Sequence, residues 1–186
     1  MMNFSGRDDR TPTYMESGMV SGEGVVEFLH SWDGVAATLI DRHLNVSGSS
    51  RLAEALFPSL RMGTNLAREM FLEVIPRSAY ASAEDLSYQV VAALHASLAW
   101  HEDDAEFEKI VGELSAMSRA FSTAWAADRQ QLRPHGVLQA THQSAGELTI
   151  RYQLLELAGG SNAILIVWRG ADPESEHALK QLVLSS

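Results

Sequence analysis

The residues that could carry chemistry most directly are the seven histidines. His95 and His101 are six positions apart, which on a helix corresponds to about 240°, so their side chains diverge. His135 and His142 are seven positions apart, and on one straight strand they face opposite sides of a sheet. Neither pair has the geometry of a metal site, and we expect neither a bound metal nor a cofactor.

A charged run from His101 to Asp104 has the composition of an acid–base or cation-binding cluster. The same run could simply begin a helix, because carboxylates are favoured at the positive end of the helix dipole. The sequence contains no phosphate-binding glycine loop, no zinc-protease motif and no nucleophile elbow. We therefore predict that the chain is not an enzyme, and a small enzyme built around an α+β pocket remains the least favoured alternative.

Aromatic, methionine and leucine side chains recur along the chain, and they can form either a solid core or the wall of an apolar pocket. His95 lies at the edge of an apolar stripe. It is either a polar contact for a ligand head group or a histidine bonded to a backbone carbonyl. The candidate ligand-binding residues are Phe57, Phe71, Leu94, His95, Met117, Phe121, Tyr152 and Trp168.

The elements that position these residues begin and end with β structure. Residues 36–40 and 44–47 predict a hairpin with a turn at Asp41 to His43. Alternating apolar residues predict a strand over 148–154, with further strands over 137–141 and 164–168. The last of these is apolar on both faces, which is typical of a central strand. Asp172 and Pro173 predict the start of a final helix.

The middle of the chain is predicted to be helical. A helix capped by Ser50 is stopped by Pro58, and another short helix carries Leu66 to Val74. Ser82 caps a helix whose apolar stripe is Leu86, Val90, Val91, Leu94 and Leu98. A longer helix opens at Asp103 and could bend or split at Gly112 or Ser118. Its apolar face is Phe107, Ile110, Val111, Leu114, Met117, Phe121 and Trp125.

Together these elements predict an α+β fold, namely a PAS-like antiparallel sheet of about five strands with helices packed on one face. Residues 1–22 are polar and show no periodicity, so we expect a disordered tail or linker there. Residues 23–186 are expected to form one PAS-like domain.

Composition limits the function further. The 186 residues carry a formal net charge of −10 and contain no cysteine. An acidic chain with scattered arginines lacks the basic face of a nucleic-acid binder. The absence of cysteine excludes disulfides and thiolate metal sites. The most apolar run, Ile164 to Trp168, is far shorter than the roughly 20 residues that span a membrane. We expect a cytoplasmic protein.

The stretch from Asp103–Asp104 through Val111-Gly112-Glu113-Leu114-Ser115 to Phe121 and Trp125-Ala126 resembles the MmyB-like ligand-binding domain of bacterial transcription regulators. Residues 40–46 with 55–57 are similar to that family's opening hairpin and helix. Residues 146–150 with Tyr152 are similar to one of its strands. Two departures are Gly48-Ser49-Ser50, where the family usually has Trp-Asn, and Leu94-His95, where it often has Leu-Arg.

The resemblance implies a PAS-like sensor of a small apolar or fatty-acid-like molecule that controls a linked DNA-binding unit. It also implies a homodimer. DNA contact would run only through a helix-turn-helix, which residues 1–22 are too few to form. The alternative is a stand-alone dimerisation or protein-interaction module that pairs with a regulator and binds no ligand. A cavity between helices and sheet would distinguish the two.

Overall fold

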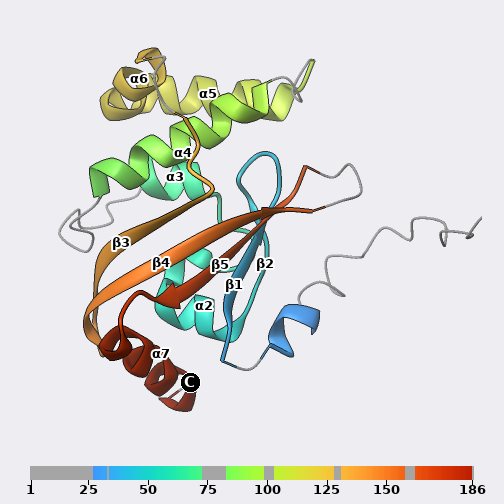
Figure 1. Ribbon diagram of the computed structural model, residues 1–186. Helices are drawn as coiled ribbons and strands as arrows, with labels where there is room; N and C mark the ends of the chain where they lie inside the picture. Colours follow the sequence, from blue (N-terminus) through green and yellow to red (C-terminus); the bar gives the residue numbers. More distant parts are fainter. Residues whose placement is uncertain are drawn as a thin grey trace, which may run out of the picture.

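The structure is a computed structural model that describes residues 27–32, 34–72, 83–98, 103–127, 131–157 and 162–185. Five antiparallel strands form one sheet in the order β2-β1-β5-β4-β3. Helices cover one face of this sheet, with α5 and α6 farthest from it (Figure 1). The predicted α+β fold, a PAS-like antiparallel sheet of five strands, is confirmed.

The opening hairpin consists of β1 (Ala36–Ile40) and β2 (Val46–Ser49). β2 begins later than predicted because Leu44 belongs to the turn, where its φ is 64°. The Asp41 carboxylate stabilises this turn by accepting hydrogen bonds from the backbone N–H groups of His43 (2.8 Å) and Asn45 (2.9 Å). Aspartate favours such turns because its short side chain reaches the backbone of following residues.

The remaining strands are β3 (His135–His142), β4 (Gly146–Glu156) and β5 (Ile164–Gly170). β5 lies between β1 and β4, as its apolar residues on both faces predicted. Leu148, Ile150 and Tyr152 alternate along β4 and are buried on the helix-covered face. The period of two in the sequence thus identified the correct face of this strand.

Two helix starts agree with the caps predicted for them. The Ser50 hydroxyl accepts a hydrogen bond from Ala53 N (3.3 Å) at the start of α2 (Arg51–Leu56). Asp172 accepts one from Ser175 N (2.7 Å) beside Pro173, where α7 (Pro173–Ser185) begins. Hydrogen bonds from Ser175 hold the pKa of Asp172 below its ordinary value of 3.8. A turn of 3₁₀ helix, η1 (Pro58–Leu60), and α3 (Leu66–Phe71) follow α2.

The long middle helix is two helices, α5 (Ala105–Met117) and α6 (Arg119–Ala126), so the predicted single stripe of seven residues is wrong. The chain divides at Ser118, one of the two sites where a break was foreseen. Ser118 is extended (φ −126°, ψ 108°), and its hydroxyl accepts a hydrogen bond from Phe121 N (3.3 Å). Serine at such a position favours a new helix start over continuation of the old helix.

The cap of α5 is Asp104 and not Asp103 as predicted. Asp104 accepts hydrogen bonds from Glu106 N and Phe107 N (both 3.1 Å), whereas Asp103 has a φ of 58°. The helix-start interpretation of the charged run therefore holds for Asp104. Val74, Ser82, His101, Glu102 and the predicted tail at 1–22 lie outside the described residues.

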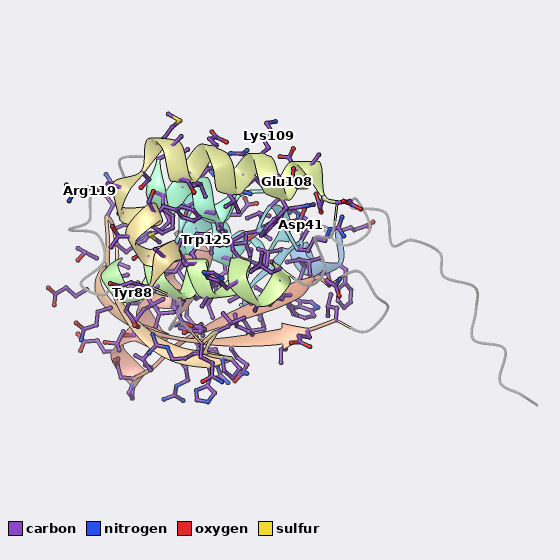
Figure 2. All side chains as sticks on the ribbon, turned by 90° about the horizontal axis from the view of Figure 1, so that it is seen from above. Asp41, Tyr88, Glu108, Lys109, Arg119 and Trp125 are labelled. Atoms are coloured by element: carbon purple, nitrogen blue, oxygen red, sulfur yellow. The ribbon has the colours of Figure 1, made fainter. Side chains whose placement is uncertain are left out.

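The two faces of the sheet belong to two hydrophobic cores, a main one under the helices and a smaller one on the opposite face. α4 (Ala83–Ser97) lies between the sheet and the α5–α6 pair (Figure 1). Exposed side chains such as Glu108 and Lys109 lie on the outer side of α5 (Figure 2). On the opposite face of the sheet, a helical turn at residues 27–30 packs Leu29 against Ala37 and Leu39. The prediction placed helices on one face of the sheet only, so this helical turn on the opposite face was not predicted.

Candidate functional site

A partly open, almost wholly apolar cavity of about 150 Å³ lies between the sheet and α4. Its floor is the helix-covered face of the sheet, and its roof is one face of α4. The lining residues that carry the following argument are Phe57, Val90, Ala93, Leu138, Tyr152, Ile166 and Trp168. A cavity of this size holds an apolar molecule about as large as benzene.

Two sides of α4 are apolar. Leu86, Val90 and Ala93 face the cavity, while Val91 and Leu94 on the other side of the helix are fully buried in the main core. Both sets are apolar, because α4 has helices above it and the cavity below it. The sequence showed one apolar stripe on this helix, and the structure divides that stripe between two environments.

The polar residues at the edge of the cavity lie around Arg133, which shortly precedes β3. The Arg133 backbone N–H donates to Gln89 Oε1 (2.8 Å), and the Arg133 guanidinium pairs with the Asp85 carboxylate. Arg133 and Gln89 both line the cavity. These contacts connect the first turns of α4 to the start of β3, so they bridge the roof and the floor.

Tyr152 lies on the cavity floor beside this polar group. Its side chain is 8% exposed, and among the described residues its hydroxyl has no hydrogen-bond partner. Burial raises the pKa of the Tyr152 phenol above 10.0; the Arg133 charge lowers it and the Asp85 charge raises it by smaller amounts. Tyr152 therefore stays an uncharged donor at neutral pH.

Trp168 is the second polar aromatic residue of the floor. It packs edge-on against Phe57, with ring centroids 5.5 Å apart, and lies 6.1 Å from the Tyr152 ring. Its indole N–H is buried and has no hydrogen-bond partner among the described residues. A buried donor without a partner is costly, so this indole N–H is an unsatisfied polar group next to the cavity.

The eight predicted ligand-binding residues fall into two groups. Phe57, Tyr152 and Trp168 line the cavity. Leu94 and Phe121 are fully buried in the core, and Phe71 packs edge-on against Phe121 with ring centroids 5.2 Å apart.

The other two predicted residues also lie away from the cavity. Met117 is 71% exposed at the end of α5, because the chain turns at Ser118. His95 stacks on Trp125 at 4.0 Å, and its Nε2 contacts the Trp125 carbonyl oxygen at 3.1 Å. This geometry is the backbone-bonded alternative stated for His95.

Sequence reasoning missed the residues that form the roof and the polar edge: Leu86, Gln89, Val90, Ala93 and Arg133. The first four repeat at intervals of three and four, so they lie on one face of α4. That spacing was visible in the sequence. The role of Arg133 was not, because its contacts depend on where β3 meets α4.

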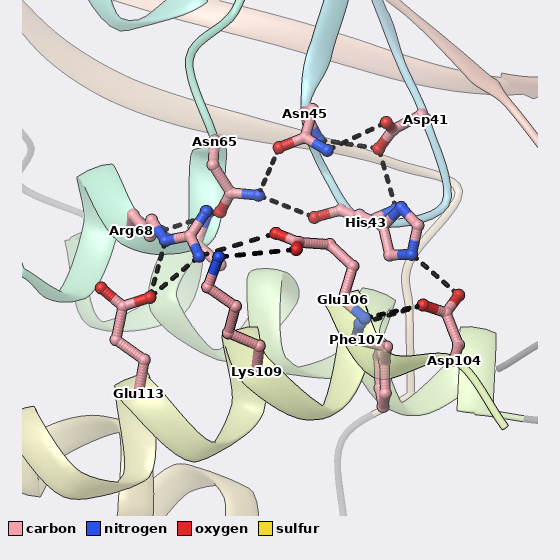
Figure 3. A network of polar contacts seen from close by, with 11 residues as sticks. Asp41, His43, Asn45, Asn65, Arg68, Asp104, Glu106, Phe107, Lys109 and Glu113 are labelled. Atoms are coloured by element: carbon pink, nitrogen blue, oxygen red, sulfur yellow. Dashed lines mark hydrogen bonds and ion pairs between the residues drawn. The ribbon is translucent and has the colours of Figure 1, made fainter.

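A polar network holds one wall of the cavity in place (Figure 3). The Asn65 side-chain amide donates to the His43 carbonyl and to Asn45 Oδ1 (both 2.8 Å), while its oxygen accepts from Ala67 N and Arg68 N (both 3.1 Å). One buried asparagine thus joins the hairpin turn to α3. Leu44 of this turn lines the cavity with its positive φ, a strained conformation that the surrounding bonds maintain.

The same network reaches α5. Asp104 Oδ2 lies 2.9 Å from both His43 Nε2 and Arg42 Nη2. Arg68 on α3 pairs with Glu113 on α5, with Nη2 and Oε2 2.8 Å apart. The hairpin turn, α3 and α5 are therefore connected by side-chain contacts at one end of the cavity (Figure 3).

Replacing Asp104 by alanine should destabilise the fold by about 1–3 kcal/mol, because α5 loses its cap and the hairpin loses its contact with α5. Asp104→Asn keeps a good capping side chain and removes only the charge. It should therefore cost less than half as much. Urea unfolding of the two variants measures the difference, and an alanine variant as stable as wild type would contradict the role assigned to Asp104.

Gly136 leaves room for the Tyr152 ring. A Cβ at Gly136 would lie 2.7 Å from Tyr152 Cε1 and Oη, on the strand directly opposite. Gly136→Ala should push the ring aside and cost roughly 1 kcal/mol. In a Tyr152→Leu background the same change should cost nothing measurable, and a double-mutant cycle by urea unfolding tests this. An equal cost in both backgrounds would show that Tyr152 is not the obstacle.

Other kinds of site find little support in the described part of the chain. No group of three or more histidine or acidic side chains there could hold a metal ion. No helix in the described ranges is long and apolar enough to cross a membrane.

Comparison with known proteins identifies a family that the chain matches. A family model described as the MmyB-like transcription regulator ligand binding domain matches residues 22–182. No curated protein matches the chain. The matched range contains every element that lines the cavity.

Proposed function

Because the chain belongs to the MmyB-like transcription regulator ligand-binding domain family, we propose that it binds a small apolar or fatty-acid-like molecule in the cavity between α4 and the sheet. It would then act as the sensory domain of a bacterial transcription regulator. The observation that carries the proposal is the cavity itself, which is apolar, partly open and lined by two aromatic residues with polar groups, Tyr152 and Trp168. A solid core would not contain such a space.

The proposed site consists of Phe57, Tyr152 and Trp168 from the sequence-based set, with Val90 and Ala93 of α4 as the roof. Phe71, Leu94 and Phe121 of that set are packed in or against the core around the site, whereas Met117 is exposed. A cavity of about 150 Å³ takes only part of a long acyl chain, so the rest would pass through the open side. Each added methylene that becomes buried should strengthen binding by about 0.8 kcal/mol until the space is full.

Native mass spectrometry of the purified protein and a thermal-shift series test the proposal. Butanoate and hexanoate should raise the melting temperature in that order, with little further gain from hexanoate to decanoate once the space is full, since a ligand that binds only the folded state stabilises it. A co-purified acyl compound would identify the ligand class directly. No shift with any apolar acid, ester or alcohol, together with a mass equal to that of the bare chain, would contradict the proposal.

We further propose that the chain does not act as an enzyme and does not contact DNA itself. Its net charge of −10 opposes binding to the phosphate backbone, and DNA contact would run through a helix-turn-helix outside the matched range. The cytoplasm is the proposed place of action, and residues 1–22 are the proposed tail ahead of the domain. Salt-sensitive binding of duplex DNA in a gel shift would contradict this part.

Homodimerisation is also proposed, and a specific observation supports it. Phe28, Val137 and Leu155 are large apolar side chains that are exposed. Val137 and Leu155 lie on the sheet face opposite the cavity, as does the turn that carries Phe28. Apolar side chains that are exposed on one side of a sheet are available for association. The same surface is what the alternative function, an interaction module without a ligand, would use. Sedimentation at tens of micromolar tests the dimer.

A further inference from the structure

The polar edge of the cavity contains an ion pair that can be exchanged for a ligand. Arg133 lines the cavity and pairs with Asp85 on α4, and the two side chains are 48% and 54% exposed. An ion pair this exposed contributes little to stability because water screens it. A second carboxylate could therefore replace Asp85 at small cost.

The other polar groups at this edge also favour an acceptor. Gln89 Oε1 accepts from the Arg133 backbone N–H, and within the described ranges the amide N–H groups of Gln89 are its remaining hydrogen-bonding function. Tyr152 is an uncharged phenol, and the charges of Arg133 and Asp85 are close enough to affect its pKa. The second charged residue of the lining, Glu69 on α3, is engaged in an interaction of its own. Among the described residues near Arg133, the groups that can form a further hydrogen bond are therefore donors.

We propose that Arg133 binds the carboxylate of an amphiphilic acid whose chain enters the cavity, and that Asp85 occupies this position in the empty protein as an internal competitor. Guanidinium binds carboxylate through two parallel hydrogen bonds. Tyr152 adds a donor from the floor. This inference rests on the proposed function, because it assigns the head-group contact of the same site. It replaces His95, which bonds to the Trp125 carbonyl.

Replacement of Asp85 by a ligand carboxylate would also alter how the first turn of α4 is held. Asp85 lies in the first turn of α4, and its pairing with Arg133 helps connect that turn to the start of β3. A ligand carboxylate on Arg133 releases this turn, while the contact between Gln89 and the Arg133 backbone remains. Occupation of the cavity is thereby coupled to the position of the first turn of α4.

The test compares decanoate with decanol, which has the same chain length and no charge, by isothermal titration at mildly alkaline pH. The readout is the ratio of their affinities in wild type, Asp85→Asn and Arg133→Gln. Arg151→Gln is the matched control, because Arg151 is an exposed arginine of β4 whose place in the strand alternation puts it on the sheet face opposite the cavity.

We expect decanoate to bind more tightly than decanol in wild type. Asp85→Asn should raise the ratio by about threefold to tenfold, because the competitor is removed. Arg133→Gln should lower it by about tenfold or more, because a charge-assisted pair is lost. Tyr152→Phe should lower it by a few-fold, and Arg151→Gln should leave it close to the wild-type value.

Two failures can be told apart. If neither decanoate nor decanol binds, the proposed function fails, and this inference fails with it. If both bind with a ratio that Asp85→Asn and Arg133→Gln leave unchanged, the head-group contact is overturned while the apolar site stands. Since Asp85→Asn keeps the shape of the side chain, it gives an answer even if Arg133→Gln unfolds.

Discussion

Phe121→Ala should destabilise the protein by about 3–5 kcal/mol, as expected for removal of a fully buried phenylalanine. Phe121 is 0% exposed. Its ring lies 5.2 Å from that of Phe71 and 5.4 Å from that of Trp125. Because Phe121 does not line the cavity, no existing space reduces the cost of the truncation. Urea unfolding measures the change.

Met117→Ala is the matched control for this experiment. Met117 precedes Phe121 by four residues, and on an unbroken helix the two would share one face. Because the helix ends at Met117 and Met117 is exposed, its truncation should change stability by less than about 0.5 kcal/mol. Equal costs at the two positions would contradict the break at Ser118 and restore the single long helix.

Ala93→Phe should reduce decanoate binding by at least about tenfold while the protein stays folded. Ala93 lines the cavity from α4, and the added ring is about the size of the molecule that such a cavity holds. Filling a cavity is commonly neutral or stabilising by about 0.5–2 kcal/mol, so loss of binding should not come with loss of stability. Isothermal titration and urea unfolding together measure both effects.

The control for Ala93→Phe lies one turn away. Ala96 is an exposed residue of α4 outside the cavity, so Ala96→Phe adds the same ring to the same helix without filling the space. Its decanoate affinity should remain within about twofold of wild type. Unchanged decanoate binding in Ala93→Phe would exclude this cavity as the site.

The sheet could be predicted from the sequence because its signals are local. The alternation along β4 and the apolar run of β5 each identify a strand within seven to eleven residues. The caps at Ser50 and Asp172 are likewise local, since the capping side chain reaches only the first turn of its own helix. The helix break at Ser118 was foreseen as a possibility and not decided, because serine is tolerated inside a helix when tertiary contacts favour it.

The candidate site was predicted only in part. Strand alternation alone assigned Tyr152 to the helix-covered face, whereas 164–168 is apolar on both faces and gave no such assignment for Trp168; both residues line the cavity. Met117 was placed wrongly because periodicity assumes an unbroken helix. His95 could not be assigned, because its partner is a backbone carbonyl of α6, 30 residues away in the sequence. Arg133 was missed because its contacts with Asp85 and Gln89 also span more than forty residues.

The sequence also could not predict that α4 contacts a cavity on one side and a packed core on the other. Leu86 and Val90 face an open space, whereas Val91 and Leu94 face packed neighbours. The same residue types serve both, because a cavity wall and a core are equally apolar. Only the separation between α4 and the sheet distinguishes them, and that separation depends on tertiary packing that no local sequence pattern describes.

The central claim is that the space between α4 and the sheet binds an apolar molecule, and isotope-filtered NMR with carbon-13-labelled decanoate tests it most directly. The account predicts intermolecular NOEs from the acyl chain to the methyl groups of Val90, Leu138 and Ile166, which line the cavity from both sides. NOEs to Val137 and Leu155 instead, on the opposite face of the sheet, would contradict it and place the ligand outside the cavity.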